Sequence, residues 1–375
     1  MTIVTTVRTG GDVDPASPRS GGTGHRTAGG APARLGLRTG FELELLAPRG
    51  TSRADLAAEV AARCGGTVRR FFHTDSEPSL VPGMGWFIHL TPGFEVLGPD
   101  GAPRCRLVDD ITLRADLDRR APARPGWYRV LGDEPRLMRL VHRLADPQAP
   151  REAVLDPLAA VFGVAPRLAG DVVVVDDTAG ATVAMAAPMP GERERACEVV
   201  TPPLTADHAA HLDALLAPAR DLGFTVPVEA AVHLHVDAAP LRVPATFANL
   251  VRLFSAWREP LRAALRTNPA CTRLAPLPDA VVAYAAGPLA PDWETLRAAV
   301  APMGLKKYAD VNLASLVTPR AEKDTVEIRC LPGMLGTEEV VAAAALVERL
   351  LARCRDPRPI GAPRPGARIE DVLGG

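Results

Sequence analysis

Two histidines and an aspartate alternate with apolar residues in the stretch EAAVHLHVD, residues 229–237. In an extended strand, successive side chains point to opposite faces. His233, His235 and Asp237 would therefore share one face, and the valines and leucine between them would share the other. Such a comb is compatible with a metal site, a substrate contact or a solvated surface. The stretch by itself does not distinguish these roles.

Three other segments place charged groups on one face of a predicted strand. In GFELELL, Glu42 and Glu44 lie on the same side, and in TVEIRCL, Glu327 and Arg329 do so. Glu198 stands at the start of CEVVTPP. Taken singly, each is explained by a solvated face or a cross-strand ion pair. Together with the histidine comb, they favour a shared polar site.

The chemistry of such a site follows from its ligand types. Carboxylates with an imidazole suit hard divalent cations, and Mg²⁺ bound by one or two carboxylates suits nucleotide phosphates. A nearby arginine stabilises charge that develops on a transferred phosphoryl group. The sequence has no GxxxxGK[ST] loop, which excludes a P-loop nucleotide site.

A zinc-dependent amide or ester hydrolase is the alternative, with His233, His235 and Asp237 as ligands. Catalytic zinc takes three protein ligands and keeps one open position. The sequence contains neither HExxH nor HxxEH, and His208 and His211 are expected on the polar face of a helix. Zinc is therefore the second choice, and it stays open at this point.

Composition narrows the class of protein. The 375 residues carry a net charge of −1 and are 47% hydrophobic, so no global basic field predicts a nucleic acid or an anionic membrane as partner. Six scattered cysteines without a CxxC pair favour reduced thiols. With no apolar signal region and no apolar run of ~20 residues, we expect a cytoplasmic protein.

The chain divides into three regions by composition. Residues 1–33 are rich in Gly, Thr, Ser and Pro and predict a disordered leader. Residues 34–355 predict a single catalytic domain with an elaboration at about 85–145 that has its own hairpin and helix. Residues 356–375 predict a flexible tail.

Periodicity predicts both helices and strands within that domain. Helices are expected at 51–65, 205–224, 244–266 with a kink at Pro260, 292–304, and 337–356 with Thr337 as cap. Strands are expected at 39–47, 85–91, 93–98, 103–110, 171–177, 197–201, 230–237 and 324–331, with a hairpin turn at 96–105. Because strands do not alternate regularly with helices, an α+β fold with an antiparallel or mixed sheet is favoured.

Five motifs in order resemble the amidoligase family, within the superfamily of glutamine synthetase and glutamate–cysteine ligase. They are GFELE (40–44), CEVVTPPL (197–204), VHLHVD (232–237), KKYADVNLASL (306–316) and TVEIRCLPGMLGTEE (325–339). The resemblance covers roughly residues 34–355. It implies a glutamine-synthetase-like domain, in which a curved antiparallel sheet flanked by helices forms an active-site trough. It also implies an ATP- and Mg²⁺-dependent (or Mn²⁺-dependent) ligase that forms an amide or isopeptide bond through an acyl phosphate.

The resemblance also assigns roles to single residues. The implied metal ligands are Glu42, Glu44, Glu198, His233 and Glu327. The implied nucleotide contacts are His235, Asn312 and Lys307, and the implied catalytic arginines are Arg329 and Arg273. Asp237 then takes a supporting or exposed role.

The implied partners are a small-molecule or peptide carboxylate and an amine, and a homo-oligomer is compatible with the superfamily. A non-catalytic binding module of the same fold is the third alternative.

Two segments depart from the family pattern. An Asp-x-Ser-Leu element usually lies shortly before the EVVTPP glutamate, whereas the closest match here, HTDSEPSL, lies upstream at residues 73–80. Glu192 and Glu194 lie close to Glu198, so which of these carboxylates binds metal is left open.

Overall fold

The computed structural model describes residues 35–78, 86–271, 273–318 and 324–374. Contacts divide the chain into Met1–Pro32 and Ala33–Gly375, and every described residue belongs to the second unit. The disordered leader expected at residues 1–33 lies outside the described residues. Of the helices that are described, none is long and apolar enough to cross a membrane.

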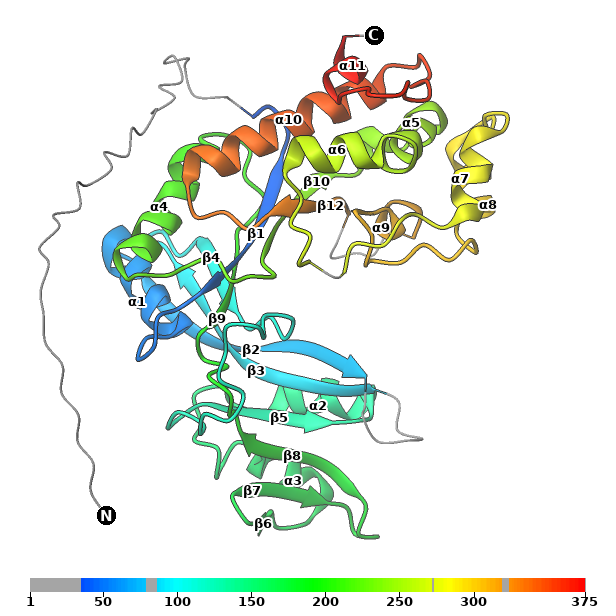
Figure 1. Cartoon of the computed structure of the whole chain (residues 1–375). Coiled ribbons are helices and arrows are strands. Elements are labelled where there is room, and N and C mark those ends of the chain that lie inside the picture. Colours follow the sequence, from blue (N-terminus) through cyan, green and yellow to red (C-terminus); the bar gives the residue numbers. More distant parts are fainter. Residues whose placement is uncertain (1–34, 79–85, 272, 319–323, 375) are drawn as a thin grey trace, which may run out of the picture. The chain divides into compact units, whose positions relative to one another are not determined.

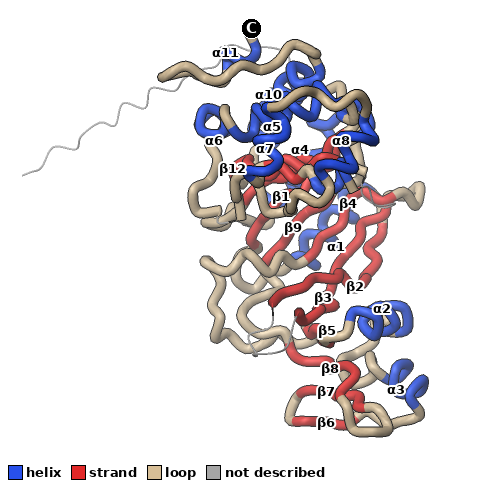
Figure 2. Tube along the Cα trace, turned by 90° about the vertical axis from the view of Figure 1, so that its right-hand side faces the viewer, coloured by secondary structure: helices blue, strands red, loops and turns tan. Residues whose placement is uncertain are grey.

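One open antiparallel sheet organises the described residues (Figures 1 and 2). Its hydrogen-bonded order is β11-β12-β10-β1-β9-β4-β3-β5-β8-β7-β6, and β2 pairs with β3 off this path. The strands are β1 (Thr39–Leu46), β2 (Thr67–Pro78), β3 (Trp86–Leu97), β4 (Pro103–Val108), β5 (Tyr128–Gly132), β6 (Arg167–Ala169), β7 (Val172–Asp176), β8 (Thr182–Pro188), β9 (Ala196–Val200), β10 (Ala231–Asp237), β11 (Val311–Asn312) and β12 (Thr325–Pro332).

Helices accompany this sheet, which confirms the α+β prediction. They are α1 (Arg53–Cys64), α2 (Pro135–Leu144), α3 (Asp156–Phe162), α4 (His208–Asp221), α5 (Pro244–Ser255), α6 (Arg258–Leu265), α7 (Asp279–Ala286), α8 (Trp293–Val300), α9 (Ala314–Val317), α10 (Thr337–Arg355) and α11 (Glu370–Leu373), with a short 3₁₀ turn, η1 (Ala239–Leu241).

The strand alternation separates an apolar face from a polar one. Phe41, Leu43 and Leu45 of β1 are fully buried in the main core, together with apolar residues of α1, α4, α5, α6 and α10. A second core lies beneath β5, β7 and β8 and includes buried residues of α2 and α3, which lie beside these strands in Figure 2. The helices thus cover apolar surface and leave the charged face of β1 and its neighbours for the site.

The region at 85–145 contributes to the sheet itself. The two strands expected at 85–91 and 93–98 form the single long β3, and β2, which periodicity did not predict, pairs with it along its whole length. The hairpin turn between β3 and β4 is present, with Gly101 at φ +74°. Because β4 also pairs with β9, this region reaches the strand that carries Glu198.

Two helix details differ from the sequence expectations. The helix expected at 244–266 is divided at Ala256–Trp257 into α5 and α6, so the predicted kink at Pro260 is wrong. Pro260 lies in the first turn of α6, where a missing N–H breaks no helical hydrogen bond. Gly336, not Thr337, caps α10, and the Thr337 hydroxyl donates to Asp213 at 2.9 Å instead.

The segment after Arg355, for which the sequence predicts a flexible tail, packs against α5 in the structure. The Asn249 amide donates to the backbone carbonyls of Asp356 (2.9 Å) and Arg358 (3.1 Å), and its oxygen accepts from the Ile360 N–H (2.9 Å). Ile360 and Val372 are buried. Asn249 therefore helps to hold this segment, together with the Trp257 indole, which donates to the Gly361 carbonyl at 2.7 Å. Low apolar content in the sequence does not reveal such contacts.

Replacing Asn249 by Ala should release residues 356–374. The variant leaves several buried backbone groups without partners, which costs about 1–3 kcal/mol. We expect faster amide hydrogen exchange in 356–374, measured by mass spectrometry. Asn268→Ala, which removes amide contacts to Val228 and Ala230 elsewhere, is the matched control. Unchanged exchange in 356–374 of the Asn249 variant would contradict the role of this side chain.

Candidate active site

Strand register brings the candidate residues together across four neighbouring strands. In β1, Glu42 lies opposite His233 of β10, and Glu44 lies opposite Glu198 of β9. His235 of β10 in turn lies opposite Glu327 of β12. Directly opposed residues in antiparallel strands have Cβ atoms about 4.5–5.5 Å apart. The pairing therefore assembles on one face residues that are up to 285 positions apart in the chain.

Glu42 is the centre of the cluster. Its Oε2 lies 3.0 Å from His233 Nδ1, and its Oε1 lies 2.9 Å from His235 Nε2. Burial acts to raise the pKa of Glu42, but hydrogen bonds from the two histidines outweigh it and hold this pKa well below its usual value. Glu42 is thus an ionised carboxylate between two imidazoles.

Glu327 is held between an amide and a guanidinium. Asn312 donates to its Oε2 at 2.9 Å, and Arg329 forms an ion pair with its Oε1. Burial acts to raise the pKa of Glu327, but the charge of Arg329 lowers it overall. A register shift between β10 and β12 at Val232/Leu234 makes Arg329 part of a β-bulge, and its N–H donates to the Asp310 carbonyl (2.9 Å). Bulges commonly re-aim side chains next to active sites.

Glu44 and Glu198 are carboxylates in a crowded acidic environment. Burial raises the pKa of each well above its usual value. Negative charge raises both further: Asp110 acts on Glu44, and Glu42 acts on Glu198. The backbone N–H of Ala231, which donates to Glu44 at 2.7 Å, opposes only part of this effect. Such crowding favours either a bound proton or a bound cation.

Among the described residues, two groups have donor atoms close enough to hold a metal ion. One is Glu42, Glu198 and His233, and the other is Glu42, His235 and Glu327, so the groups share Glu42. Oxygen-rich sets with one imidazole each fit Mg²⁺ or Mn²⁺ better than a zinc site. Asp237 belongs to neither group, and its carboxylate accepts from the Ala239 N–H (3.0 Å). The zinc hydrolase alternative is therefore not favoured.

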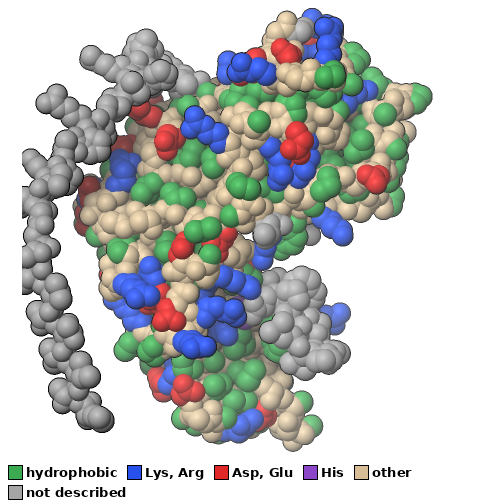
Figure 3. Space-filling view, viewed as in Figure 1, with side chains coloured by type: hydrophobic (Ala, Val, Ile, Leu, Met, Phe, Trp, Pro, Cys, Tyr) green, Lys and Arg blue, Asp and Glu red, His purple; other side chains and the backbone are tan. Residues whose placement is uncertain are grey.

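These side chains line one cleft of about 620 Å³. Glu44 and Glu198 lie on its carboxylate-rich side, and Arg329, Arg273 and Lys307 also line it. Tyr308 organises the last two, because Arg273 lies 5.0 Å and Lys307 4.9 Å from the centre of its ring. Lys306, the neighbouring lysine, is exposed and does not line the cleft. On the face shown in Figure 3, basic and acidic side chains are interspersed.

The structure thus brings the predicted site residues together in space. Glu42, Glu44, Glu198, His233, Glu327, Arg329, Arg273 and Lys307 line the cleft, and His235 and Asn312 contact its carboxylates. Glu192 instead pairs with Arg195 and Arg49, and of the three neighbouring glutamates only Glu198 lines the cleft. Their chemical roles remain predictions.

Sequence reasoning missed Asp110, the second residue after the end of β4. Asp110 lines the cleft and interacts with Glu44, and it accepts hydrogen bonds from the Thr112 N–H and hydroxyl, both at 2.8 Å. The sequence signal for the turn that carries Asp110 was the pair Asp109-Asp110 at a strand end, followed by Thr112. Asp and Thr side chains favour a turn because they hydrogen-bond to nearby backbone groups. His73 and Asp75 of the HTDSEPSL segment also line the cleft, from β2.

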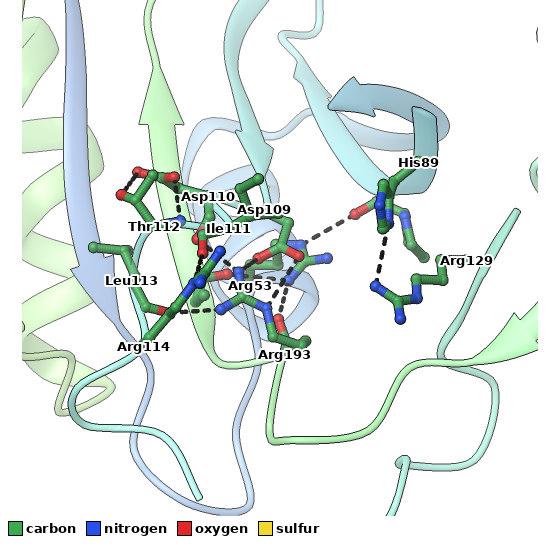
Figure 4. A network of polar contacts seen from close by, with 12 residues as sticks. Arg53, His89, Asp109, Asp110, Ile111, Thr112, Leu113, Arg114, Arg129 and Arg193 are labelled. Carbon is green, nitrogen blue, oxygen red and sulfur yellow. Dashed lines mark hydrogen bonds and ion pairs between the residues drawn. The ribbon is translucent and has the colours of Figure 1, made fainter. Parts of the chain in front are cut away.

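A buried polar network holds the loop that carries Asp110 (Figure 4). Arg193 forms an ion pair with Asp109 and donates to the backbone carbonyls of Asp110 (2.6 Å) and Leu113 (2.5 Å). Arg53, fully buried at the start of α1, donates to the Arg193 carbonyl at 2.6 Å. Its guanidinium lies 4.6 Å from the centre of the Trp127 ring. The network therefore fixes the backbone on both sides of Asp110.

Comparison with known proteins identifies the class of this chain. A family model described as "Putative amidoligase enzyme" matches residues 35–351. Because the match spans most of the sequence, the chain belongs to this amidoligase family, as the motifs predicted. Neither the curated proteins nor the solved structures gave a match.

Glu198→Gln should stabilise the metal-free protein at pH 8. A carboxyl whose pKa is raised by folding contributes stability below its unfolded pKa, and this contribution is lost as pH rises through the folded pKa. Glutamine imitates the protonated form, so we expect its midpoint of thermal unfolding to rise by about 2 °C or more at pH 8 and by less at pH 5.

The same measurement tests the acidic cluster as a cation site. Millimolar Mg²⁺ should stabilise the wild type at pH 8 and stabilise Glu198→Gln less. Glu338→Gln, an exposed change in the first turn of α10, is the control. A lower unfolding midpoint for Glu198→Gln at pH 8 without metal would contradict the electrostatic crowding.

Arg193→Met should destabilise the protein strongly. Asp109 has a side-chain exposure of 1%, and losing its guanidinium partner leaves a buried charge unpaired, which costs about 3–5 kcal/mol. Urea unfolding measures the loss. Arg167→Met breaks the exposed pair with Asp176 and should cost at most about 1 kcal/mol. Equal losses of unfolding free energy in the two variants would contradict the prediction that the buried pair contributes more stability than the exposed pair.

Proposed function

We propose that this amidoligase is an ATP- and Mg²⁺-dependent carboxylate–amine ligase that forms an amide or isopeptide bond. The observation that carries the proposal is the site itself. Carboxylates and histidines from four adjoining strands meet Arg329 in one cleft, within a chain of the amidoligase family. Mn²⁺ fits the same ligand set. In this proposal, the charged face of the antiparallel sheet would serve as the glutamine-synthetase-like trough that the resemblance implies.

Bound ATP and its divalent cation would supply the activation: the γ-phosphoryl group would pass to the substrate carboxylate with ADP as leaving group. The amine would then attack the acyl phosphate and form the amide, with release of inorganic phosphate and a proton. The chain's own carboxylates divide into two sets for this purpose. Glu42, Glu198 and His233 would hold one cation, and Glu42, His235 and Glu327 would hold a second. Sharing Glu42 would keep the two cations close together, as in other phosphoryl-transfer sites.

Arg329 would stabilise negative charge on the transferred group. Its guanidinium already contacts Glu327, and burial in the cleft strengthens any electrostatic contact it makes. Asn312 would orient Glu327, because its amide donates to the second carboxylate oxygen. Lys307 and Arg273, which both lie against the Tyr308 ring and line the cleft, would contact the nucleotide phosphates or the substrate.

The six free cysteines of the described residues and the need for ATP support a cytoplasmic location. Substrates in this proposal are a carboxylate and an amine carried by small molecules or peptides. A homo-oligomer stays a prediction.

The ligase proposal predicts that Glu327→Gln abolishes carboxylate-dependent ATP turnover. The change removes a charge from a cation site, and losing one such group costs about 100-fold or more in rate. Purified protein is incubated with Mg²⁺-ATP, hydroxylamine as the amine and a panel of amino acids and short peptides. Phosphate release and hydroxamate formation are then measured.

Glu338→Gln, which changes an exposed glutamate remote from the cleft, should keep full activity. Calorimetry with Mg²⁺-ATP separates binding from turnover. The absence of both binding heat and hydroxamate, with no difference between the two variants, would refute the ligase proposal.

A further inference from the structure

A second groove, which we call the α2 groove, lies between α2 and the β2–β3 hairpin. Thr74 and Ile88 line it from the strands, and Arg136, Arg139, His142 and Arg143 line it from the helix. Its volume is about 760 Å³. Figure 2 shows α2 beside β5, on the same side of the sheet as α3.

Three arginines give the α2 groove its charge. Arg136, Arg139 and Arg143 recur at intervals of three and four residues, which places them along one helix face. All three are exposed, and in the part of the chain that the structure describes none of them forms an ion pair. None of the described residues lining the groove is acidic. The stripe therefore presents positive charge that none of the described residues neutralises through an ion pair.

Contacts of α2 with the second core and with β2 fix the direction of this stripe. Met138 and Val141 are buried in the second core. His142 Nε2 donates to the Phe72 carbonyl of β2 at 3.0 Å, which joins the helix to the hairpin. Glu134 caps the helix by accepting from the Arg136 N–H at 2.9 Å. Because α2 is held at its core face, its arginines are presented to solvent by a rigid element.

Thr74 connects the α2 groove to the active-site cleft. Thr74 lines both spaces, and its neighbours His73 and Asp75 line the cleft. Thr74 is exposed, so the two spaces meet at an open edge of β2. An extended chain with its reacting group in the cleft can continue across Thr74 toward α2.

We infer that the α2 groove binds acidic side chains of a polypeptide substrate whose reacting carboxylate or amine occupies the cleft. This inference rests on the proposed ligase function and assigns its substrate class. The chemistry that recognises the substrate is guanidinium pairing with carboxylate groups.

The stripe sets the length of the recognised segment. Residues 136 and 143 are seven positions apart, which is roughly 10 Å along a helix axis. An extended peptide covers that distance in about three residues. A segment of about four residues containing two or three acidic side chains therefore matches the three arginines.

An acidic peptide fits better than a nucleic acid strand. Nucleic-acid sites follow the phosphate backbone with extended positive surface. Here the positive stripe is short, the net charge of the chain is −1, and the adjoining cleft holds several carboxylates. A continuous polyphosphate would meet those carboxylates, whereas a peptide need carry its acidic residues only along α2.

The test measures binding of fluorescein-labelled hexaglutamate to the full chain by fluorescence anisotropy, at about 50 and 300 mM salt. We expect R136E/R139E/R143E to weaken binding at least about tenfold at low salt, and less at high salt, because exposed pairs are screened. The matched control R349E/R355E/R364E changes net charge equally at three exposed arginines outside the groove. It should alter binding by less than about twofold.

Two further arms separate the possible results. Labelled hexaglutamine should bind weakly to every variant, and a six-nucleotide thymidine strand should bind less tightly than hexaglutamate. Equal loss in the groove and control variants, or tighter binding of the nucleotide strand, overturns the inference. Circular dichroism verifies that the groove variant folds, and R136Q/R139Q/R143Q provides a milder substitute with the same expected direction.

The binding assay contains no ATP and is repeated with Glu327→Gln, so it does not depend on ligase activity. Hydroxamate formation without hexaglutamate binding would refute the α2 inference and leave the proposed function intact. Hexaglutamate binding through the arginines without any ligation would refute the proposed function and retain an acidic-peptide site.

Discussion

The carboxylates gathered on one face of β1 and β9 are the constraint around which the site is built. Strand pairing places Glu44 directly opposite Glu198, and Glu42 and Asp110 add further negative charge. Like charges opposed across a sheet destabilise it. The surrounding groups offset this repulsion unevenly: two histidines stabilise the ionised form of Glu42, whereas Glu44 and Glu198 keep raised pKa values. The protein thus retains binding energy that a cation can use.

Maintaining such a cluster requires a rigid support. The apolar face of β1 is buried by α1, α4, α5 and α10, which leaves the charged face little freedom to relax. On the other side, the pairing of Arg193 with Asp109 fixes the loop after β4. Because breaking a buried ion pair leaves an uncompensated charge, this loop cannot move without a large cost. The site is therefore supported on one side by a buried ion pair and on the other by apolar packing.

The sequence predicted those parts of the site that depend on local pattern. Alternation placed Glu42 with Glu44, His233 with His235, and Glu327 with Arg329 on shared faces, and motif order placed the strands in one site. It could not predict that β4 pairs with β9, because that register depends on contacts between distant segments. Asp110 was missed for this reason.

A helix was predicted within the elaboration at about 85–145, but its bounds and the role of its arginines were not. Its segment was assigned as a whole to an elaboration of the domain, and its link to the cleft depends on Thr74 of a strand that periodicity did not predict. The tail after Arg355 is a comparable case, since the buried Asn249 amide and the Trp257 indole hold it by hydrogen bonds. In both segments, the observed structure depends on contacts with residues that are far away in the sequence.

The two spaces that meet at Thr74 have opposite electrostatic character, and this difference orients what binds. The cleft is rich in carboxylates, which would repel an anionic group unless a cation, as proposed, neutralises them. The α2 groove offers guanidinium groups that form no ion pair with the described residues, and these would attract anions without any cofactor. Under the proposed function, a substrate with an acidic segment would therefore be drawn first to α2, and its reacting group would enter the cleft once the carboxylates there are neutralised. This proposed order of binding rests on the difference in charge between the two spaces.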